Sequence, residues 1–197
     1  MDTQILLSIC VGIGLSAACG FRVFVPVLAL SIGAFTGHLH LAQNFAWIGS
    51  KPALVAFAVA TVFEICAYYI PFLDNLLDTI AGPTAAIAGI LVTASLMADI
   101  DPMWRWTFAV IAGGGIAGTT QLATTKLRLA SSAATGGMGN HILSTIEAVF
   151  STGLSVFAIV LPVVAVLLVI VILIACWWMI YAVGKRVFRW LRPKPTA

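Results

Sequence analysis

Residues 163–184 read VVAVLLVIVILIACWWMIYAVG and contain no charged side chain. An apolar run of about 18 residues or more is long enough to cross the hydrocarbon core of a bilayer as a helix. The whole chain of 197 residues is 61% hydrophobic and only 9% charged, with a mean hydropathy of +1.10. A soluble domain carries roughly 25% charged residues. The composition therefore excludes a soluble protein and predicts an all-α integral membrane protein.

Other apolar stretches resemble this one, and together they predict about six transmembrane segments: residues 5–36, 53–72, 83–100, 107–125, 141–161 and 163–184. Residues 1–184 then form one helical membrane domain. Pro162 separates the last two segments without a polar residue beside it. Because proline is tolerated inside membrane helices, this position marks either a turn between two spans or a kink in one long helix.

The first of these segments is too long to be one straight span. At about 1.5 Å per residue, residues 5–36 would reach well over 40 Å, whereas the hydrocarbon core is roughly 30 Å thick. Gly20, Arg22 and Pro26 lie near its middle and favour a break. The segment is therefore either a broken span or a re-entrant hairpin, and a hairpin would move the N-terminus to the outer side.

Basic side chains are concentrated in a predicted C-terminal tail, residues 185–197, as Lys185, Arg186, Arg189, Arg192 and Lys194. Since basic loops of membrane proteins lie mainly on the cytoplasmic side, we expect a cytoplasmic C-terminus. Counting back through six spans also places Lys126 and Arg128 inside. No folded domain accompanies the tail, so we expect it to contact membrane lipids with anionic headgroups and not nucleic acid.

The two halves of the sequence resemble each other. GIGLSA, residues 12–17, matches GGGIAG, residues 113–118, and each is followed by a basic residue and then by a glutamate in an apolar segment. Three spans in each half predict a 3+3 inverted repeat with broken or re-entrant helices, a common plan of secondary transporters. Chance similarity between glycine-rich helices is the alternative.

Three charged residues, Arg22, Glu64 and Glu147, lie in otherwise apolar segments. Each costs on the order of 2.5–3.5 kcal/mol in a membrane, and such residues face the bundle interior and usually pair. Either Arg22 binds an anion while the glutamates pair with it or carry protons, or the three form a static ion pair that fixes the helix register.

Two further polar clusters predict sites. Asp74 and Asp78 are four residues apart and share a helix face, which suits a proton or cation site or a solvated interfacial helix. Residues 131–140 are rich in serine and glycine and follow two basic residues. Backbone N–H groups before a helix make an anion nest there, with a flexible loop as the alternative.

The sequence contains no nucleophile–base pair, no phosphate-binding loop and no dinucleotide fingerprint. His38 and His40 lie in a loop without the helical spacing of a metal site. We therefore predict a protein that is not an enzyme and has no cofactor and no metal.

Three stretches carry a family resemblance: GLSAACGFRVFVP (residues 14–26), IPFLDNLLD (70–78) after Glu64, and KLR through TGGMGN (126–140) before Ser144 and Glu147. Together they resemble the motifs, including GFRxFxP and TGGxGN, of a domain-of-unknown-function family of small bacterial integral membrane proteins. The resemblance implies a multi-pass protein of the bacterial inner membrane. It nominates these residues: Arg22, Glu64, Asp74, Asp78, Arg128, Asn140 and Glu147.

The chain departs from that family at Tyr68-Tyr69, where the resemblance leads us to expect charged residues. A charge relay is therefore not predicted at that position. FRVFVP, residues 21–26, is also similar to an Arg-Pro motif in the re-entrant hairpins of the DedA lipid-carrier translocases.

These patterns predict a transporter or lipid translocase for a small or lipid-linked anion, such as a polyprenyl phosphate. The substrate-binding residues expected are Arg22, Glu64, Lys126, Arg128, Asn140 and Glu147, with Asp74 and Asp78 as a proton or cation site. The alternatives are a membrane scaffold, favoured by many small residues suited to helix packing, and a cation channel lined by Glu64, Glu147 and the threonines of residues 119–125. A homo-oligomer fits each of them.

Overall fold

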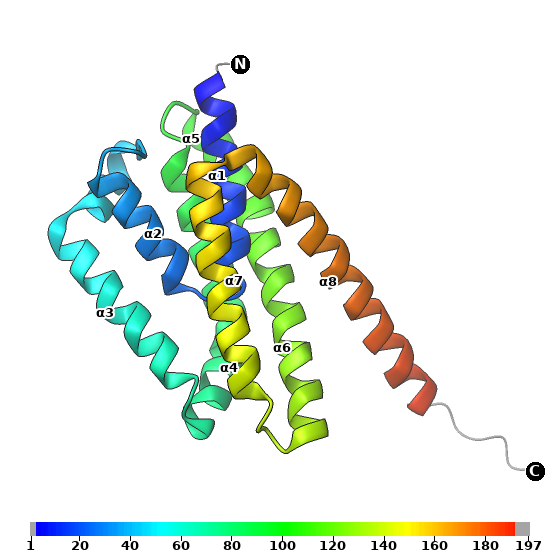
Figure 1. Cartoon of the computed structure of the whole chain (residues 1–197). Helices are drawn as coiled ribbons and strands as arrows, with labels where there is room; N and C mark the ends of the chain where they lie inside the picture. Colours follow the sequence, from blue (N-terminus) through cyan, green and yellow to red (C-terminus); the bar gives the residue numbers. More distant parts are fainter. Residues whose placement is uncertain (1–2, 192–197) are drawn as a thin grey trace, which may run out of the picture.

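The computed structural model describes residues 3–191, which form helices and connecting loops and contain no strand. The elements are α1 (Thr3–Cys19), α2 (Phe24–Phe35), the 3₁₀ helix η1 (Gln43–Gly49), α3 (Lys51–Ala67), α4 (Pro71–Leu96), α5 (Pro102–Phe108), the π-helix η2 (Ala109–Gly114), α6 (Gly115–Thr135), α7 (Asn140–Val160) and α8 (Pro162–Leu191). Figure 1 shows them as one bundle, from which α8 slants away. The predicted all-α fold is confirmed.

Three helical stretches are long and apolar enough to cross a membrane: Leu76–Leu96, Asn140–Val160 and Pro162–Met179. A fourth is obtained if η1 and α3, which are bent by 65° at their junction, count as one span. By length and composition the described residues therefore contain three or four spans, fewer than the six predicted. The difference arises because α1 and α2 are each short and because α6 carries polar and basic side chains.

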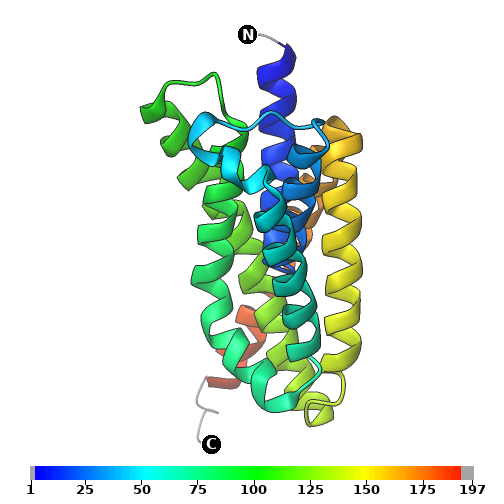
Figure 2. The same ribbon diagram turned by 90° about the vertical axis from the view of Figure 1, so that its left-hand side faces the viewer.

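The chain turns back on itself between α1 and α2. In Figures 1 and 2, α1 enters the bundle at the end that holds the N-terminus, stops about midway, and α2 returns towards the same end. The predicted segment 5–36 is thus a hairpin of two short apolar helices and not one continuous helix. Pro26 is the third residue of α2, a position where its missing N–H needs no partner within the helix.

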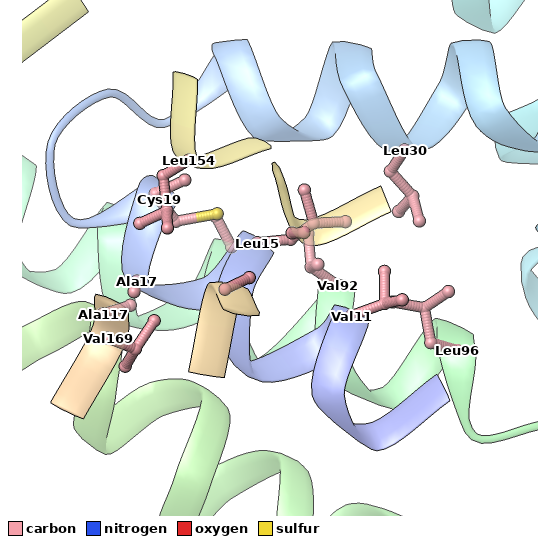
Figure 3. Packing of buried hydrophobic residues seen from close by; sticks show 14 of the residues in the cluster. Val11, Leu15, Ala17, Cys19, Leu30, Val92, Leu96, Ala117, Leu154 and Val169 are labelled. Atoms are coloured by element: carbon pink, nitrogen blue, oxygen red, sulfur yellow. The ribbon is translucent and has the colours of Figure 1, made fainter. Parts of the chain in front are cut away.

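Helix α1 forms the centre of the bundle, in contact with α4, α6, α7 and α8. Figure 3 shows its side chains Val11, Leu15 and Cys19 among the buried apolar residues of the neighbouring helices. Small residues allow this close approach. A Cβ atom added to Gly14 would lie only 2.6 Å from Cβ of Ala158. Polar contacts accompany the packing, since the Ser16 hydroxyl donates to the carbonyl of Gly89 at 3.0 Å.

Pro162 marks a turn. α7 ends at Val160 and α8 begins at Pro162, and the two helices run in opposite directions in Figure 1. Proline is well suited to the first position of a helix. Its fixed φ angle matches that of a helix, and an N–H group at this position would have no partner within the helix. Helix α8 continues to Leu191, so the first part of the predicted basic tail is helical. Residues 192–197, with Arg192 and Lys194, lie outside the described residues.

The described helices do not confirm an inverted repeat. The glutamate-bearing helices α3 and α7 do run in opposite directions, but α1 and α6, which carry the matching glycine motifs, run in the same direction (Figures 1 and 2). Moreover, the break at residues 20–23 has no counterpart in α6, which is continuous from Gly115 to Thr135.

Candidate functional site

Two almost completely buried arginines lie in the interior of the bundle. Arg22, in the loop at the hairpin tip, is 1% exposed, and Arg128, on α6, is 2% exposed. Buried carboxylates and an amide from α4 and α7 surround them. We refer to this group as the charge network, which consists of Arg22, Asp74, Asp78, Arg128, Asn140 and Glu147.

Arg128 is the centre of the charge network, and each of its three nitrogens has a carboxylate partner. Nε donates to Oε1 of Glu147 at 3.1 Å, and Nη2 donates to Oε2 of the same residue. Nη1 donates to Oδ1 of Asp74 and lies 3.8 Å from Oδ1 of Asp78. The two-fold contact with Glu147 is the bidentate geometry that makes arginine–carboxylate pairs strong. Arg128 is thus fully engaged by α4 and α7.

Arg22 has fewer partners. Its Nη2 donates to the carbonyl and the hydroxyl of Ser144 at 2.9 and 2.5 Å, and it lies 3.4 Å from Oε2 of Glu147. Neither Nε nor Nη1 has a hydrogen-bond acceptor among residues 3–191. A buried donor without an acceptor is costly. Arg22 is therefore the cation of the charge network that has capacity left for another acceptor.

Tyr68 contacts both guanidinium groups through its ring. The Cζ atom of Arg22 lies 3.7 Å and that of Arg128 4.4 Å from the ring centroid. An aromatic face attracts cations, most strongly where water is excluded. Tyr68 thus stands where the resemblance led us to expect charge, and it helps hold the two like charges close together. This role is not predictable from the sequence, because nothing distinguishes one buried tyrosine from the many aromatic residues of a membrane protein.

Glu64 lies beside the charge network and has a distinct role. Its Oε1 accepts from the backbone N–H of Val23 at 2.7 Å, and its Oε2 accepts from that of Phe24 at 3.0 Å. The first N–H groups of a helix lack partners within it, and the positive end of the helix dipole favours a carboxylate there. Glu64 is on α3, so one helix caps the N-terminus of another and fixes the hairpin break.

A second polar region adjoins the charge network at the turn between α6 and α7. Gly136 and Gly137 have φ angles of +63° and +94°, which glycine adopts readily, and they lead into Asn140, the first residue of α7. The Asn140 Nδ2 donates to Oδ2 of Asp74 at 3.2 Å and to the Ser132 hydroxyl at 2.9 Å. A pocket of about 430 Å³ opens here.

Lys126 is not part of the charge network. On α6, Gln121, Thr124 and Arg128 face the interior. Lys126 lies two residues from Arg128, about 200° further around the helix, and has no ion pair with another described residue. All the other predicted site residues come together at or beside the network. The comparison of the two halves had matched Arg22 with Lys126, whereas Arg128 is its neighbour in space.

The charge network has an excess of negative charge. Two arginines face three carboxylates, those of Asp74, Asp78 and Glu147. With all five groups ionised, one negative charge remains uncompensated. The carboxylate of Glu64 has no ion pair with either arginine and is not counted as part of the network, since it accepts from the backbone N–H groups of Val23 and Phe24.

Two of the three histidines lie at the other end of the bundle, whereas His141 lines the pocket at the turn between α6 and α7. His38 and His40 line a pocket of about 280 Å³ together with Asp99. Within residues 3–191, no three or more histidine, cysteine or acidic side chains are grouped so as to hold a metal ion.

A helical bundle with three or four candidate membrane spans, and a helical hairpin whose tip carries a buried arginine, define the class of protein. Residues 9–182 match the family described as Domain of unknown function (DUF4126). Because this match covers most of the chain, the protein belongs to that family, and the predicted membership in a domain-of-unknown-function family is confirmed. No curated protein and no solved structure matches the chain.

Proposed function

We propose that the protein is a transporter or lipid translocase for an anion, and that Arg22 binds the anionic group. One observation carries this proposal: Arg22 is 1% exposed, sits at the tip of the hairpin between α1 and α2, and has two nitrogens without an acceptor in the described part of the chain. Desolvating a cation is costly unless acceptors replace the lost water. Oxygens of a phosphate or carboxylate supply such acceptors. The N-terminus of α2 next to Arg22 adds a partial positive charge.

Glu147 makes the binding reversible in this proposal. It contacts Arg128 through both carboxylate oxygens but lies 3.4 Å from the nearest nitrogen of Arg22. An incoming anion therefore competes with one weak ion pair of Arg22, while the hydrogen bonds of Arg22 to Ser144 and the pairing of Arg128 stay intact. Exchange of one acceptor for another costs little, as transport requires.

A neighbouring apolar pocket supports a lipid-linked anion over a free one. The pocket has a volume of about 450 Å³ and is lined by the start of α2, by α3 and by α4, including Phe24, Phe63 and Leu77. Tyr68 lines it too and also contacts the guanidinium of Arg22. An acyl or prenyl chain would occupy the pocket while its phosphate reaches Arg22. A polyprenyl phosphate has this chemistry.

The proposal places the protein in a bacterial inner membrane with a cytoplasmic C-terminus. Helices α6 and α8 run towards the end of the bundle at which the C-terminus lies (Figure 1). Lys126, Arg128 and the basic tail thus share one side, as the positive-inside rule expects. The hairpin would then enter from the outer side.

A membrane scaffold is the second candidate, and the packing of α1 favours it. Contacts as close as that between Gly14 and Ala158 make the hairpin rigid, and Arg128 is fully paired. The apolar side chains of α8, such as Leu167 and Ile174, are exposed to lipid or to a second copy of the chain. No observation favours a cation channel, because Glu64 and Glu147 are bound to internal donors.

Thermal unfolding of the purified protein in detergent tests the anion site. Phosphate, a polyprenyl phosphate and simple carboxylates are added to the wild type, Arg22→Ala, Arg22→Lys and the control Lys126→Ala. Binding raises Tm by an amount set by ligand concentration relative to Kd. We expect a rise with the polyprenyl phosphate in the wild type and in Lys126→Ala. Arg22→Lys should weaken it, since a point charge replaces a planar fork.

In Arg22→Ala the rise should vanish. Equal shifts in Arg22→Ala and the wild type would refute the anion site. If no anion shifts Tm and Arg22→Ala is merely less stable, the scaffold candidate is favoured.

A further inference from the structure

Asp78 is the carboxylate of the charge network that is held most weakly. Its Oδ1 lies 3.8 Å from Nη1 of Arg128, the longest ion pair of the network. This oxygen is buried and has no hydrogen-bond donor within the described part of the chain. Asp74 and Glu147, in contrast, both accept hydrogen bonds from Arg128. Since hydrogen bonds to a carboxylate favour its ionised form, Asp78 gains least from being ionised.

The charge balance of the network favours one proton on a carboxylate. Two arginines face three carboxylates, so protonation of one of them makes the group neutral. A buried carboxylate without a well-paired cation is costly, and it commonly takes up a proton instead. The side chain of Asp78 is 18% exposed, whereas those of Asp74 and Glu147 are 6% exposed. Asp78 is therefore the carboxylate that water reaches most easily and that loses the weakest contact on protonation.

The surroundings of Asp78 connect it electrically to the hairpin tip. Charged and titratable groups act on it from its own helix, from α6, from α7, from the hairpin tip and from the turn after α3: Asp74, Arg128, Glu147, Arg22 and Tyr68. An anion bound at Arg22 would neutralise one of the two cations in this set. It would thereby remove part of the attraction that favours the ionised form of Asp78. Anion binding at Arg22 and protonation of Asp78 thus assist each other.

We propose that Asp78 takes up a proton from water when an anion binds to Arg22, so that the protein carries the anion together with a proton. The carboxylate becomes a neutral carboxyl group, and no other covalent bond forms or breaks. This inference rests on the proposed anion site and adds its coupling ion. Arg128 connects the two positions, because it pairs with Asp78 and shares the ring of Tyr68 with Arg22. The coupling is reciprocal, so the proton raises the affinity for the anion by the same factor.

His141 is the rival explanation for any dependence of anion binding on pH. It lines the pocket at the turn between α6 and α7, and its Nδ1 is buried without a hydrogen-bond partner among residues 3–191. Histidine is the side chain that most often changes its charge between about pH 5 and about pH 8, and a cationic imidazole would also attract an anion. The experiment therefore needs a His141→Gln variant beside Asp78→Asn.

The test measures the Kd of a polyprenyl phosphate by calorimetric titration of the detergent-purified protein at about pH 6 and about pH 8. We expect the gain in affinity at the lower pH to be about tenfold larger in the wild type and in His141→Gln than in Asp78→Asn. The phosphate of the probe titrates equally in all three experiments, so a difference between the proteins belongs to the protein. At the higher pH, Asp78→Asn should bind more tightly than the wild type, because asparagine resembles the protonated side chain.

The outcomes separate the coupling from the anion site itself. Equal pH dependence in Asp78→Asn and the wild type overturns the coupling and leaves the anion site intact, as does loss of the pH dependence in His141→Gln alone. Absence of binding to all three proteins removes the anion site, and the coupling with it.

A second measurement decides if Asp78→Asn does not fold. An alkyl sulfonate, whose own charge does not change in this pH range, is added to the wild type and to His141→Gln in weak buffer with a pH-indicator dye. Binding should make both proteins take up protons, which raises the pH of the solution. Binding without a rise in pH overturns the inference.

Discussion

Arg22 and Arg128 meet at one carboxylate oxygen. Oε2 of Glu147 lies 3.4 Å from Nη2 of Arg22 and accepts a hydrogen bond from Nη2 of Arg128. The hairpin tip and α6 are thereby joined through α7 by a single buried side chain. Removal of one partner from a buried ion pair leaves an uncompensated charge, and this is far more costly than replacing the whole pair. The stability of the network therefore depends most on Glu147.

Glu147→Gln should lower the free energy of unfolding by about 3–5 kcal/mol. Glutamine keeps the shape of the side chain but replaces one of the two acceptor oxygens with an NH2 group that faces the guanidinium of Arg128, and it removes the carboxylate nearest to Arg22. Reversible unfolding in mixed micelles by dodecyl sulfate titration measures the difference. Asp99→Asn is the control, since Asp99 is exposed and its loss should change stability by no more than about 0.5 kcal/mol. A Glu147→Gln protein as stable as the control would contradict the pairing.

Tyr68 should act through its ring and not through its hydroxyl. Tyr68→Phe keeps the face on which both guanidiniums lie and should unfold close to the wild type. Tyr68→Leu is similarly apolar but has no π-face, and we expect it to be about 2 kcal/mol less stable than Tyr68→Phe. The same unfolding titration compares the two variants. Equal stabilities would show that only burial at this position matters.

Glu64→Ala should loosen the start of α2. The backbone N–H groups of Val23 and Phe24 lose their acceptors, at a cost of about 1–2 kcal/mol, as for other helix caps. Hydrogen exchange followed by mass spectrometry should show faster exchange in a peptide that covers residues 20–27. Glu64→Gln keeps one acceptor oxygen, so its exchange rate in this peptide should lie between those of the wild type and Glu64→Ala. Asp101→Ala is the control, because it uncaps only the distant amide of Met103.

The residues of the charge network were predictable because charge is rare in this sequence. Arg22 and Glu147 stand out in apolar segments, and Asp74 and Asp78 share a helix face. Lys126, which the internal comparison matches with Arg22, lies outside the charge network. Helical periodicity favours Arg128 instead, which continues the interior face of Gln121 and Thr124. The spacing of three and four residues from Gln121 to Thr124 and from Thr124 to Arg128 places Arg128 on the interior face and Lys126 on another face.

The direction in which the chain turns at the hairpin tip was not predictable from the sequence. Segment length required a break near Gly20, and both a hairpin and a broken span satisfied that requirement. The choice depends on contacts between α1 and residues far along the chain, such as Ala117 on α6 and Ala158 on α7. Local sequence patterns contain no information on those partners. The cap that Glu64 provides for α2 is hidden for the same reason.

Two glycine variants should separate the packing of α1 from helix propensity. In Gly14→Ala the new Cβ would lie 2.6 Å from Cβ of Ala158, whereas a Cβ added to Gly153 on α7 would meet no atom of another described element within 4 Å. Gly14→Ala should therefore cost about 1–3 kcal/mol through overpacking. Gly153→Ala should be neutral or raise stability by up to about 1 kcal/mol, since alanine loses less backbone freedom than glycine. Both are measured by the unfolding titration, and a stabilising Gly14→Ala would show that α1 and α7 are not in close contact.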